Sequence, residues 1–119
     1  MSSRPTRSER SRGRWPSRWE KRMLAALCRF DLRLPGCSSL KEKRHVVKNL
    51  TSSLRNKFNV AVAEVDHHDL WQRTAIGVAS VAEEGYHLKR VMHQVERHIW
   101  TFPAIEVIDS DLSFHGPED

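Results

Sequence analysis

The sequence predicts an α+β fold in which four strands and two helices follow one another in the order βαββαβ. Apolar and polar residues alternate over 24–34, which indicates a half-buried strand. Residues 40–57, and a second stretch after Gly85, instead repeat their apolar residues every three or four positions, as one face of a helix does. The 119 residues are enough for one domain with a single two-layer core.

The first strand and the first helix have clear boundary signals. Pro35-Gly36 is a turn sequence that ends the strand. Ser39 followed three residues later by Glu42 is a capping-box pattern, so a helix is expected over 40–57. The core-facing residues predicted for the strand are Leu24, Ala26, Cys28, Phe30, Leu32 and Leu34, and those for the helix are Leu40, Val47, Leu50 and Leu54.

The second half of the chain repeats this pattern. A polar turn over 66–69 joins predicted strands over 60–65 and 72–82, and a last strand is expected over 105–114. The helix between them should turn inward Leu88, Val91, Met92, Val95 and Ile99. An antiparallel sheet with both helices on one face satisfies the right-handed connection rule. We therefore expect the ferredoxin-like arrangement.

The domain is expected to cover 23–115, followed by a polar C-terminal end over 116–119. Residues 1–22 are rich in Ser, Arg and Pro and carry eight Arg or Lys against two Glu, a net charge of +6. They have no apolar periodicity, so they are predicted to be a disordered basic tail. The alternative is that they are upstream sequence read from a wrongly assigned start codon.

Basic residues gather on the predicted helices. The net charge is +6 over 23–57 and −7 over 58–119, so one side of the domain should be basic. Cations in the first turn of a helix, beside free backbone N–H groups, attract phosphate. An ordinary solvated basic face is the alternative. The predicted nucleic-acid-binding residues are Lys41, Lys43, Arg44, Lys48 and Arg55 of the first helix, with Lys89, Arg90 and Arg97 of the second.

The sheet face away from the helices is predicted to be small and apolar. It should carry Ala61, Ala63, Val65, Ala75, Gly77, Ala79 and Val81, beside Arg29, Asp31 and Arg33. A face meant for water would be more polar, so a homodimer or a protein partner is one interpretation, and simple space filling is the other. The face lacks the aromatic residues with which an RNA-recognition sheet stacks bases.

The hairpin turn holds two further candidates. Residues 64–69 combine His and carboxylate side chains, but their spacing is poor for a metal site, so a polar turn is the preferred interpretation and no cofactor is expected. Trp71 is interpreted as an anchor over the edge of the core. The alternative is an exposed partner contact made with Gln72 and Arg73.

Neither catalysis nor a cysteine-based site is indicated. The sequence has no Gly-rich phosphate loop, nucleophile elbow or paired Ser–His arrangement, so we expect a protein that is not an enzyme. Cys28 and Cys37 are too few for a disulfide scaffold or a zinc site. No apolar run approaches the ~20 residues of a membrane helix, and no signal peptide is evident, so a cytoplasmic protein is expected.

Four segments resemble the YlxP-like family of small bacterial proteins of unknown function. They are Phe30–Gly36, Ser39–Arg44, Phe58–Asp66 and Asp69–Gln72, within a similarity that spans Met23 to Leu112. The resemblance implies a ferredoxin-like fold and, from the genes that often lie beside those of the family, a role linked to RNA or the ribosome. It implies no catalytic residue, and it places 1–22 outside the family's usual extent.

These observations lead to two functional hypotheses from different classes. The first is a non-enzymatic protein that binds ribosomal RNA or ribosomal particles by docking its basic helix face on phosphates. The alternative is a homodimeric protein-interaction or regulatory module that uses the apolar sheet face.

Overall fold

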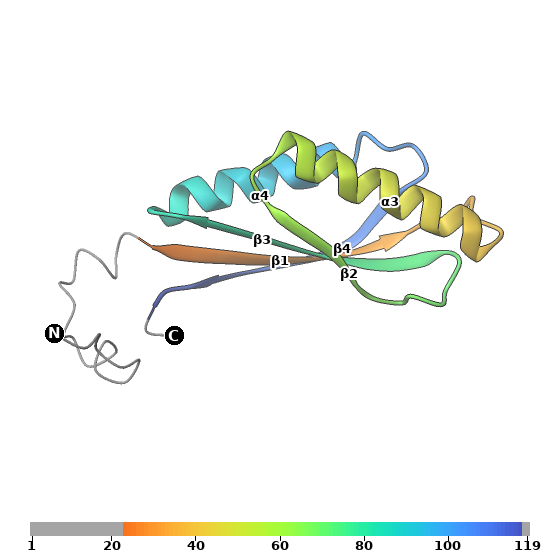
Figure 1. The fold of residues 1–119 in the computed structure, drawn as a ribbon, viewed down its shortest axis with the longest axis horizontal. Helices are drawn as coiled ribbons and strands as arrows, with labels where there is room; N and C mark the ends of the chain where they lie inside the picture. Colours follow the sequence, from red (N-terminus) through yellow and green to blue (C-terminus); the bar gives the residue numbers. More distant parts are fainter. Residues whose placement is uncertain (1–22, 118–119) are drawn as a thin grey trace, which may run out of the picture.

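A computed structural model describes residues 23–117, so the predicted tail over 1–22 and the last two residues of the C-terminal end lie outside the described residues. The elements follow the predicted order, βαββαβ (Figure 1). They are β1 (Leu24–Arg33), α3 (Leu40–Lys57), β2 (Ala61–Asp66), β3 (Arg73–Ala82), α4 (Gly85–Ile99) and β4 (Glu106–His115). The predicted first helix is confirmed residue for residue, and the predicted strand boundaries differ from the observed ones by about one residue.

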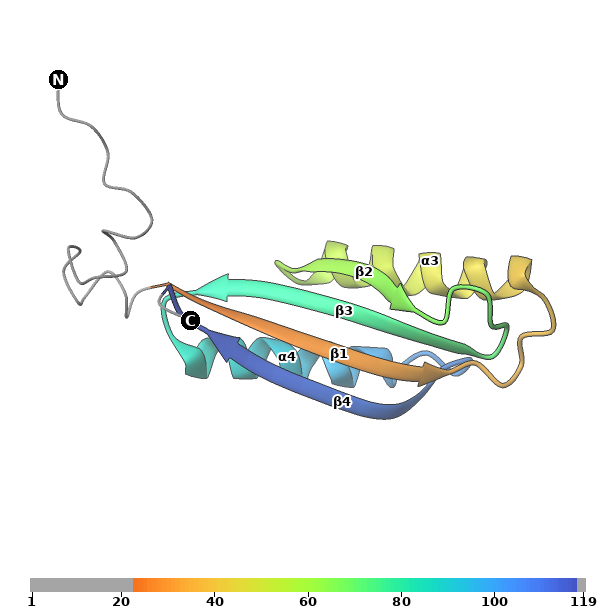
Figure 2. The same ribbon diagram turned by 90° about the horizontal axis from the view of Figure 1, so that it is seen from below.

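The four strands form one antiparallel sheet in the order β2-β3-β1-β4. Both helices cover the same face of the sheet (Figure 1). Figure 2 looks onto the opposite face, which no other element of the described chain covers. The predicted ferredoxin-like arrangement is therefore confirmed.

The core lies between the sheet and the two helices. Phe30 and Leu32 of β1 are at most 1% exposed, and Leu50, Leu54 and Leu88 of the helices are completely buried. Burial of each such side chain stabilises the fold by roughly 1.5–3 kcal/mol. This packing confirms the predicted alternation in β1 and the predicted apolar faces of both helices, except that Leu40 is neither a core residue nor packed against the core.

The start of α3 is fixed by a variant of the capping box. The backbone N–H of Glu42 donates to Ser39 Oγ at 3.1 Å, as the pattern predicts. The Glu42 carboxylate accepts hydrogen bonds from the backbone N–H of Ser38 at 2.8 Å and from Ser38 Oγ at 3.0 Å. These bonds hold the pKa of Glu42 below its ordinary value. At the other end of the helix, the Phe58 N–H donates to Leu54 O.

Replacement of Ser39 by Ala should therefore lower the free energy of unfolding by about 1 kcal/mol, because the Glu42 N–H loses its acceptor. Urea denaturation followed by circular dichroism measures the change. Ser52→Ala in the middle of the same helix is the matched control and should change stability by less than about 0.5 kcal/mol. Equal effects of the two substitutions would contradict the cap.

A bulge in β2 decides which way three consecutive side chains point. Glu64 pairs with Ile76 and Asp66 with Ala75, so Val65 is the extra residue. Val65 lies over Gly77, where an added Cβ would stand 2.9 Å from Val65 Cγ1. The bulge consequently leaves Glu64 on the helix side of the sheet and brings Asp66 to the open face.

Candidate functional site

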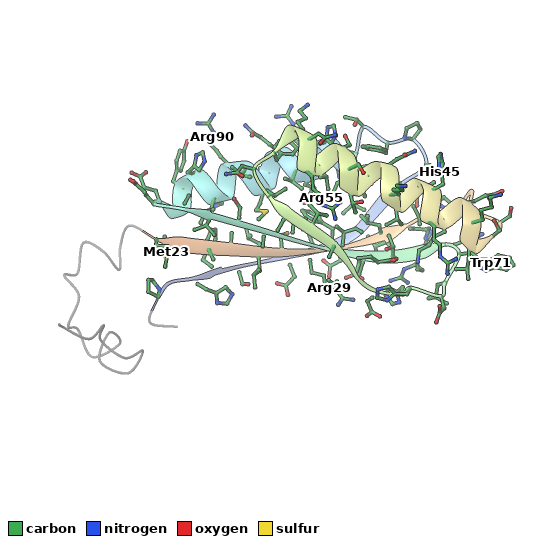
Figure 3. The ribbon with its side chains drawn as sticks, viewed as in Figure 1. Met23, Arg29, His45, Arg55, Trp71 and Arg90 are labelled. Carbon is green, nitrogen blue, oxygen red and sulfur yellow. The ribbon has the colours of Figure 1, made fainter. Side chains whose placement is uncertain are left out.

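The helix layer carries exposed cations that no acidic group neutralises. On α3 these are Lys41, Arg44, Lys48, Arg55 and Lys57, and on α4 they are Lys89, Arg90 and Arg97. Within residues 23–117 none of them lies within 4.0 Å of a carboxylate oxygen. By contrast, Arg29 on the open sheet face pairs with Asp31 at 3.2 Å and with Asp66 at 3.0 Å. Figure 3 places Arg29 below the sheet, with Arg90 and His45 on the far side of the helices.

Lys57 lines a hollow on another side of α3. The other four exposed cations of α3 form one stripe, here called the α3 flank and defined as Lys41, Arg44, Lys48 and Arg55. Their steps of three, four and seven residues keep them on one side of a helix over about 21 Å. Arg55 Nη2 donates to the carbonyl oxygen of Val62 at 2.7 Å. Because Val62 belongs to the edge strand β2, this bond places the α3 flank along the β2 edge of the molecule.

Another side of α3, which contacts α4, borders a shallow hollow of about 570 Å³. The hollow is lined by Asn49, Ser52, Ser53, Asn56, Lys57 and Phe102. Ser53 Oγ and His98 Nε2 lie 2.7 Å apart and join the two helices. Burial and the nearby Lys57 charge lower the pKa of His98. The cations of α4 therefore lie across this hollow from the α3 flank, and the two predicted sets do not form one continuous stripe.

The prediction of Lys43 as a surface cation is wrong, because its side chain is completely buried. Lys43 Nζ lies 2.7 Å from Glu64 Oε2 and donates to the carbonyl oxygens of His67 at 2.8 Å and His68 at 3.0 Å. Thr74 Oγ1 donates to the same carboxylate oxygen at 2.5 Å. Burial tends to raise the pKa of Glu64, but the bonds from Lys43 and Thr74 outweigh it and leave that pKa lowered. Lys43 thus has no free donor for a phosphate.

Two observations count against the predicted phosphate site at the start of α3, and the burial of Lys43 is the first. The Glu42 carboxylate already accepts the hydrogen bonds of Ser38 at this end of the helix. A phosphate placed there would meet the Glu42 carboxylate, and of the three predicted cations only Lys41 and Arg44 are exposed. The candidate anion site is therefore the side of the helix and not its N-terminus.

The polar segment 64–69 is divided between the two faces of the sheet. Glu64 binds Lys43 beneath α3, whereas Asp66 binds Arg29 on the open face. Hydrogen bonds from Arg29 and from the His67 N–H lower the pKa of Asp66. His67 has a φ of 60°, which lets the chain turn sharply after β2. Within the described chain, no group of three or more His, Cys, Asp or Glu side chains could hold a metal ion.

The predicted partner contacts Trp71, Gln72 and Arg73 differ in exposure and in hydrogen bonding. Trp71 is 52% exposed and lies outside the core, so its interpretation as a core-edge anchor is wrong (Figure 3). Gln72 Nε2 instead holds the β1–α3 connection by donating to Cys37 O at 3.2 Å and Pro35 O at 3.4 Å. Arg73 has a buried Nε with no hydrogen-bond partner among the described residues.

Sequence reasoning missed the Lys43–Glu64 pair, although a signal for it was present. Lys43 stands four residues before Val47 and seven before Leu50, so it falls on the apolar stripe of the helix. The pair connects the Ser39–Arg44 segment with the Phe58–Asp66 segment across the core. These are two of the segments that carry the family resemblance.

Both cysteines are free and buried. Burial, with the nearby Glu96 charge, raises the pKa of Cys28 to about 11. Burial likewise raises the pKa of Cys37. Neither thiol is therefore a ready thiolate nucleophile near neutral pH.

Comparison with solved structures finds distant likenesses to the same chain arrangement. A crystal structure of SnoaB, a cofactor-independent oxygenase from Streptomyces nogalater, has a TM-score of 0.42 at 11% identity and covers 79% of this chain and 91% of its own. A putative antibiotic biosynthesis monooxygenase from Bacillus cereus has a TM-score of 0.38 at 13% identity over 80% and 92% of the two chains. These likenesses are too distant to bear on chemistry.

In residues 23–117 no helix combines the length and apolarity needed to span a membrane.

Sequence comparison is more specific. The uncharacterized protein YlxP of Bacillus subtilis (strain 168) is 41% identical over 68 residues, which are 57% of this chain and 74% of that protein. Residues 25–112 match the family described as "Protein of unknown function (DUF503)". The match covers nearly all of the folded domain, so the chain belongs to this family, the YlxP-like family that its motifs resemble.

Proposed function

We propose that this protein is a non-enzymatic RNA-binding protein that docks on phosphates through the α3 flank. One observation carries the proposal: the cations of the helix layer have no acidic partners, whereas Arg29 and Lys43 are both neutralised within the fold. Four unpaired cations along about 21 Å of helix match a chain of phosphates better than a single small anion. Ribosomal RNA is the first RNA to examine, because the family resemblance implies a setting among translation genes.

The chemistry of the α3 flank favours phosphate contacts over base readout. Its neighbours on the outer side of α3 are polar, such as His45, Asn49 and Ser52, and α3 contains no Phe, Tyr or Trp. Phosphate contacts give affinity and position without reading sequence. The acidic edge strand β4, with Glu106, Asp109 and Asp111, would keep RNA off the opposite side of the domain.

The affinity for RNA should depend steeply on salt. With four phosphate contacts on a single strand, the logarithm of the binding constant should fall with the logarithm of salt concentration with a slope of about −3. Titration of the full chain with a fluorescent single-stranded RNA at several salt concentrations measures the slope. A slope near zero, or no binding at low salt, would refute phosphate docking.

Sedimentation tests whether the RNA that the protein binds is part of a ribosomal particle. Lysate that contains the tagged full chain is run through a low-salt sucrose gradient with and without ribonuclease. Migration with ribosomal particles that is lost with ribonuclease or at higher salt supports the proposal. A protein that stays at the top of the gradient, while binding free RNA in the titration, would exclude the ribosome but keep RNA docking.

A further inference from the structure

The open face of the sheet is apolar where no element of the described chain covers it. Leu27, Val65 and Val81 are 49%, 48% and 62% exposed there. Between them the strands carry small residues, as the register of Leu27 with Ala79 and of Ala79 with Ala61 shows, beside one arginine, Arg29, which stands opposite Gly77. They surround a shallow hollow of about 480 Å³. Exposed aliphatic side chains around small ones allow a second flat surface to approach closely.

Charges of opposite sign that have a weak ion pair or none lie at two different margins of this face. At the β1–β3 end, Arg33 stands directly opposite Arg73. Like charges in this register destabilise a sheet unless an anion reaches them. Arg33 has only a long contact of 3.9 Å with Glu106, and Arg73 has no ion pair within residues 23–117. Along the β4 edge, Asp109 and Asp111 occupy the open face, and neither has an ion pair there.

The positions of these charges fit a second copy of the same face. In a two-fold pair with the two sheets crossed at about 90°, the β4 edge of each copy lies over the β1–β3 end of the other. Each arginine pair then meets the aspartates of the partner copy. The small residues around Gly77 meet at the centre, beside Arg29, whose charge Asp31 and Asp66 of its own copy neutralise. The surface is thus self-complementary in the way that an isologous interface requires.

We propose that the protein is a homodimer through this sheet face, with Arg33 and Arg73 of each copy opposite Asp109 and Asp111 of the other. This goes beyond RNA docking and does not depend on it, because the α3 flank lies on the other side of the sheet. Three of the strands have ten residues. The face therefore measures about 33 Å by about 19 Å. Two such faces crossed at about 90° overlap over about 19 Å by about 19 Å, or about 360 Å² per partner before side-chain relief, which is less than the ~800 Å² of a standard interface and predicts a weaker dimer.

The mass of the full chain in solution is the first test. Light scattering after size exclusion at about 50 μM should give twice the chain mass of 13.8 kDa. Ala79→Arg and, separately, Val81→Lys place a charge in the interface and should give the monomer mass, with an unchanged circular dichroism spectrum. Ser52→Arg on the helix layer is the matched control and should stay dimeric. A wild-type monomer at this concentration, or a dimer that both sheet variants leave intact, overturns the proposal.

A charge swap tests the arrangement of the dimer. Arg73→Glu and Asp111→Lys should each weaken the dimer at least about 10-fold, because each places like charges together across the interface. The two changes in one chain should restore the dimer to within a few-fold of wild type, since every pair is then reversed. If the double variant is weaker than either single one, the crossed arrangement is wrong. Loss of the dimer with an unchanged RNA titration separates this proposal from the proposed function.

Discussion

Replacement of Lys43 by Met should lower the free energy of unfolding by about 3–5 kcal/mol, the largest effect of any single charged side chain in this domain. The reason is the ion pair that Lys43 makes with Glu64 beneath α3, with the lysine side chain completely buried. Met fills a similar volume but leaves the Glu64 carboxylate and two backbone carbonyl groups without their donor. Urea denaturation monitored by circular dichroism measures the loss.

Two further variants separate the ion pair from simple packing. Lys41→Met lies two residues earlier on the exposed side of the same helix and should change stability by less than about 0.5 kcal/mol. In Lys43→Met/Glu64→Gln the uncompensated charge is gone, while the amide oxygen can still accept the bond from Thr74. This double variant should recover about half of the loss. A double variant no better than Lys43→Met would contradict the ion pair as the cause.

The same pair predicts a pH dependence with a definite sign. The pKa of Glu64 is lowered from its ordinary value of 4.5 in the folded protein. Its contribution to stability is therefore fully present above about pH 4.5 and is lost as the pH falls through the lowered value. The stability difference between wild type and Lys43→Met should accordingly shrink in acid. A difference that stays constant from pH 7 to pH 3 would contradict the assignment.

The double charge reversal Arg44→Glu/Lys48→Glu should weaken RNA binding on the order of 100-fold at low salt and reduce the salt slope by at least about 1. Both side chains are exposed and unpaired at the middle of the α3 flank, so the change removes two phosphate contacts and adds repulsion. The readout is the titration with single-stranded RNA. Because neither side chain packs in the core, the free energy of unfolding should stay within about 1 kcal/mol of wild type.

The matched control carries the same change of net charge on the other helix. Lys89→Glu/Arg90→Glu alters α4, which lies across the hollow from the α3 flank. It should weaken binding by no more than about 10-fold, through loss of long-range attraction alone. Equal losses in the two variants would show that net charge, and not the α3 flank, is responsible. Either result leaves the dimer test unaffected.

The secondary structure could be predicted closely because its causes are local. Alternation in β1 follows from one buried face, and the start of α3 follows from the side chain of Ser39 and the backbone next to it. Trp71 could not be assigned in this way. Whether a tryptophan at a hairpin covers the core or projects from it depends on the direction of a turn, here set by the positive φ of His67.

Helical spacing predicts which cations of the candidate site are exposed, except where long-range pairing decides it. Arg44 and Lys48 lie on the exposed side of α3, as their position opposite Leu50 requires. The sequence places Lys43 in the same predicted set because it lies between Lys41 and Arg44. Its place on the apolar stripe was readable in the sequence, but its carboxylate partner stands 21 residues later and could not be identified by spacing alone.

The sequence by itself determined the order of the elements, the buried face of each one and the basic character of the helix layer, since all three depend on side chains close together in the chain. Only the tertiary structure decided which cations are free. The bulge at Val65 sends Glu64 to Lys43 and Asp66 to Arg29, and so neutralises two cations from opposite faces of one strand. A charge is available to a partner only when no opposite charge reaches it, and that depends on contacts between residues distant in sequence.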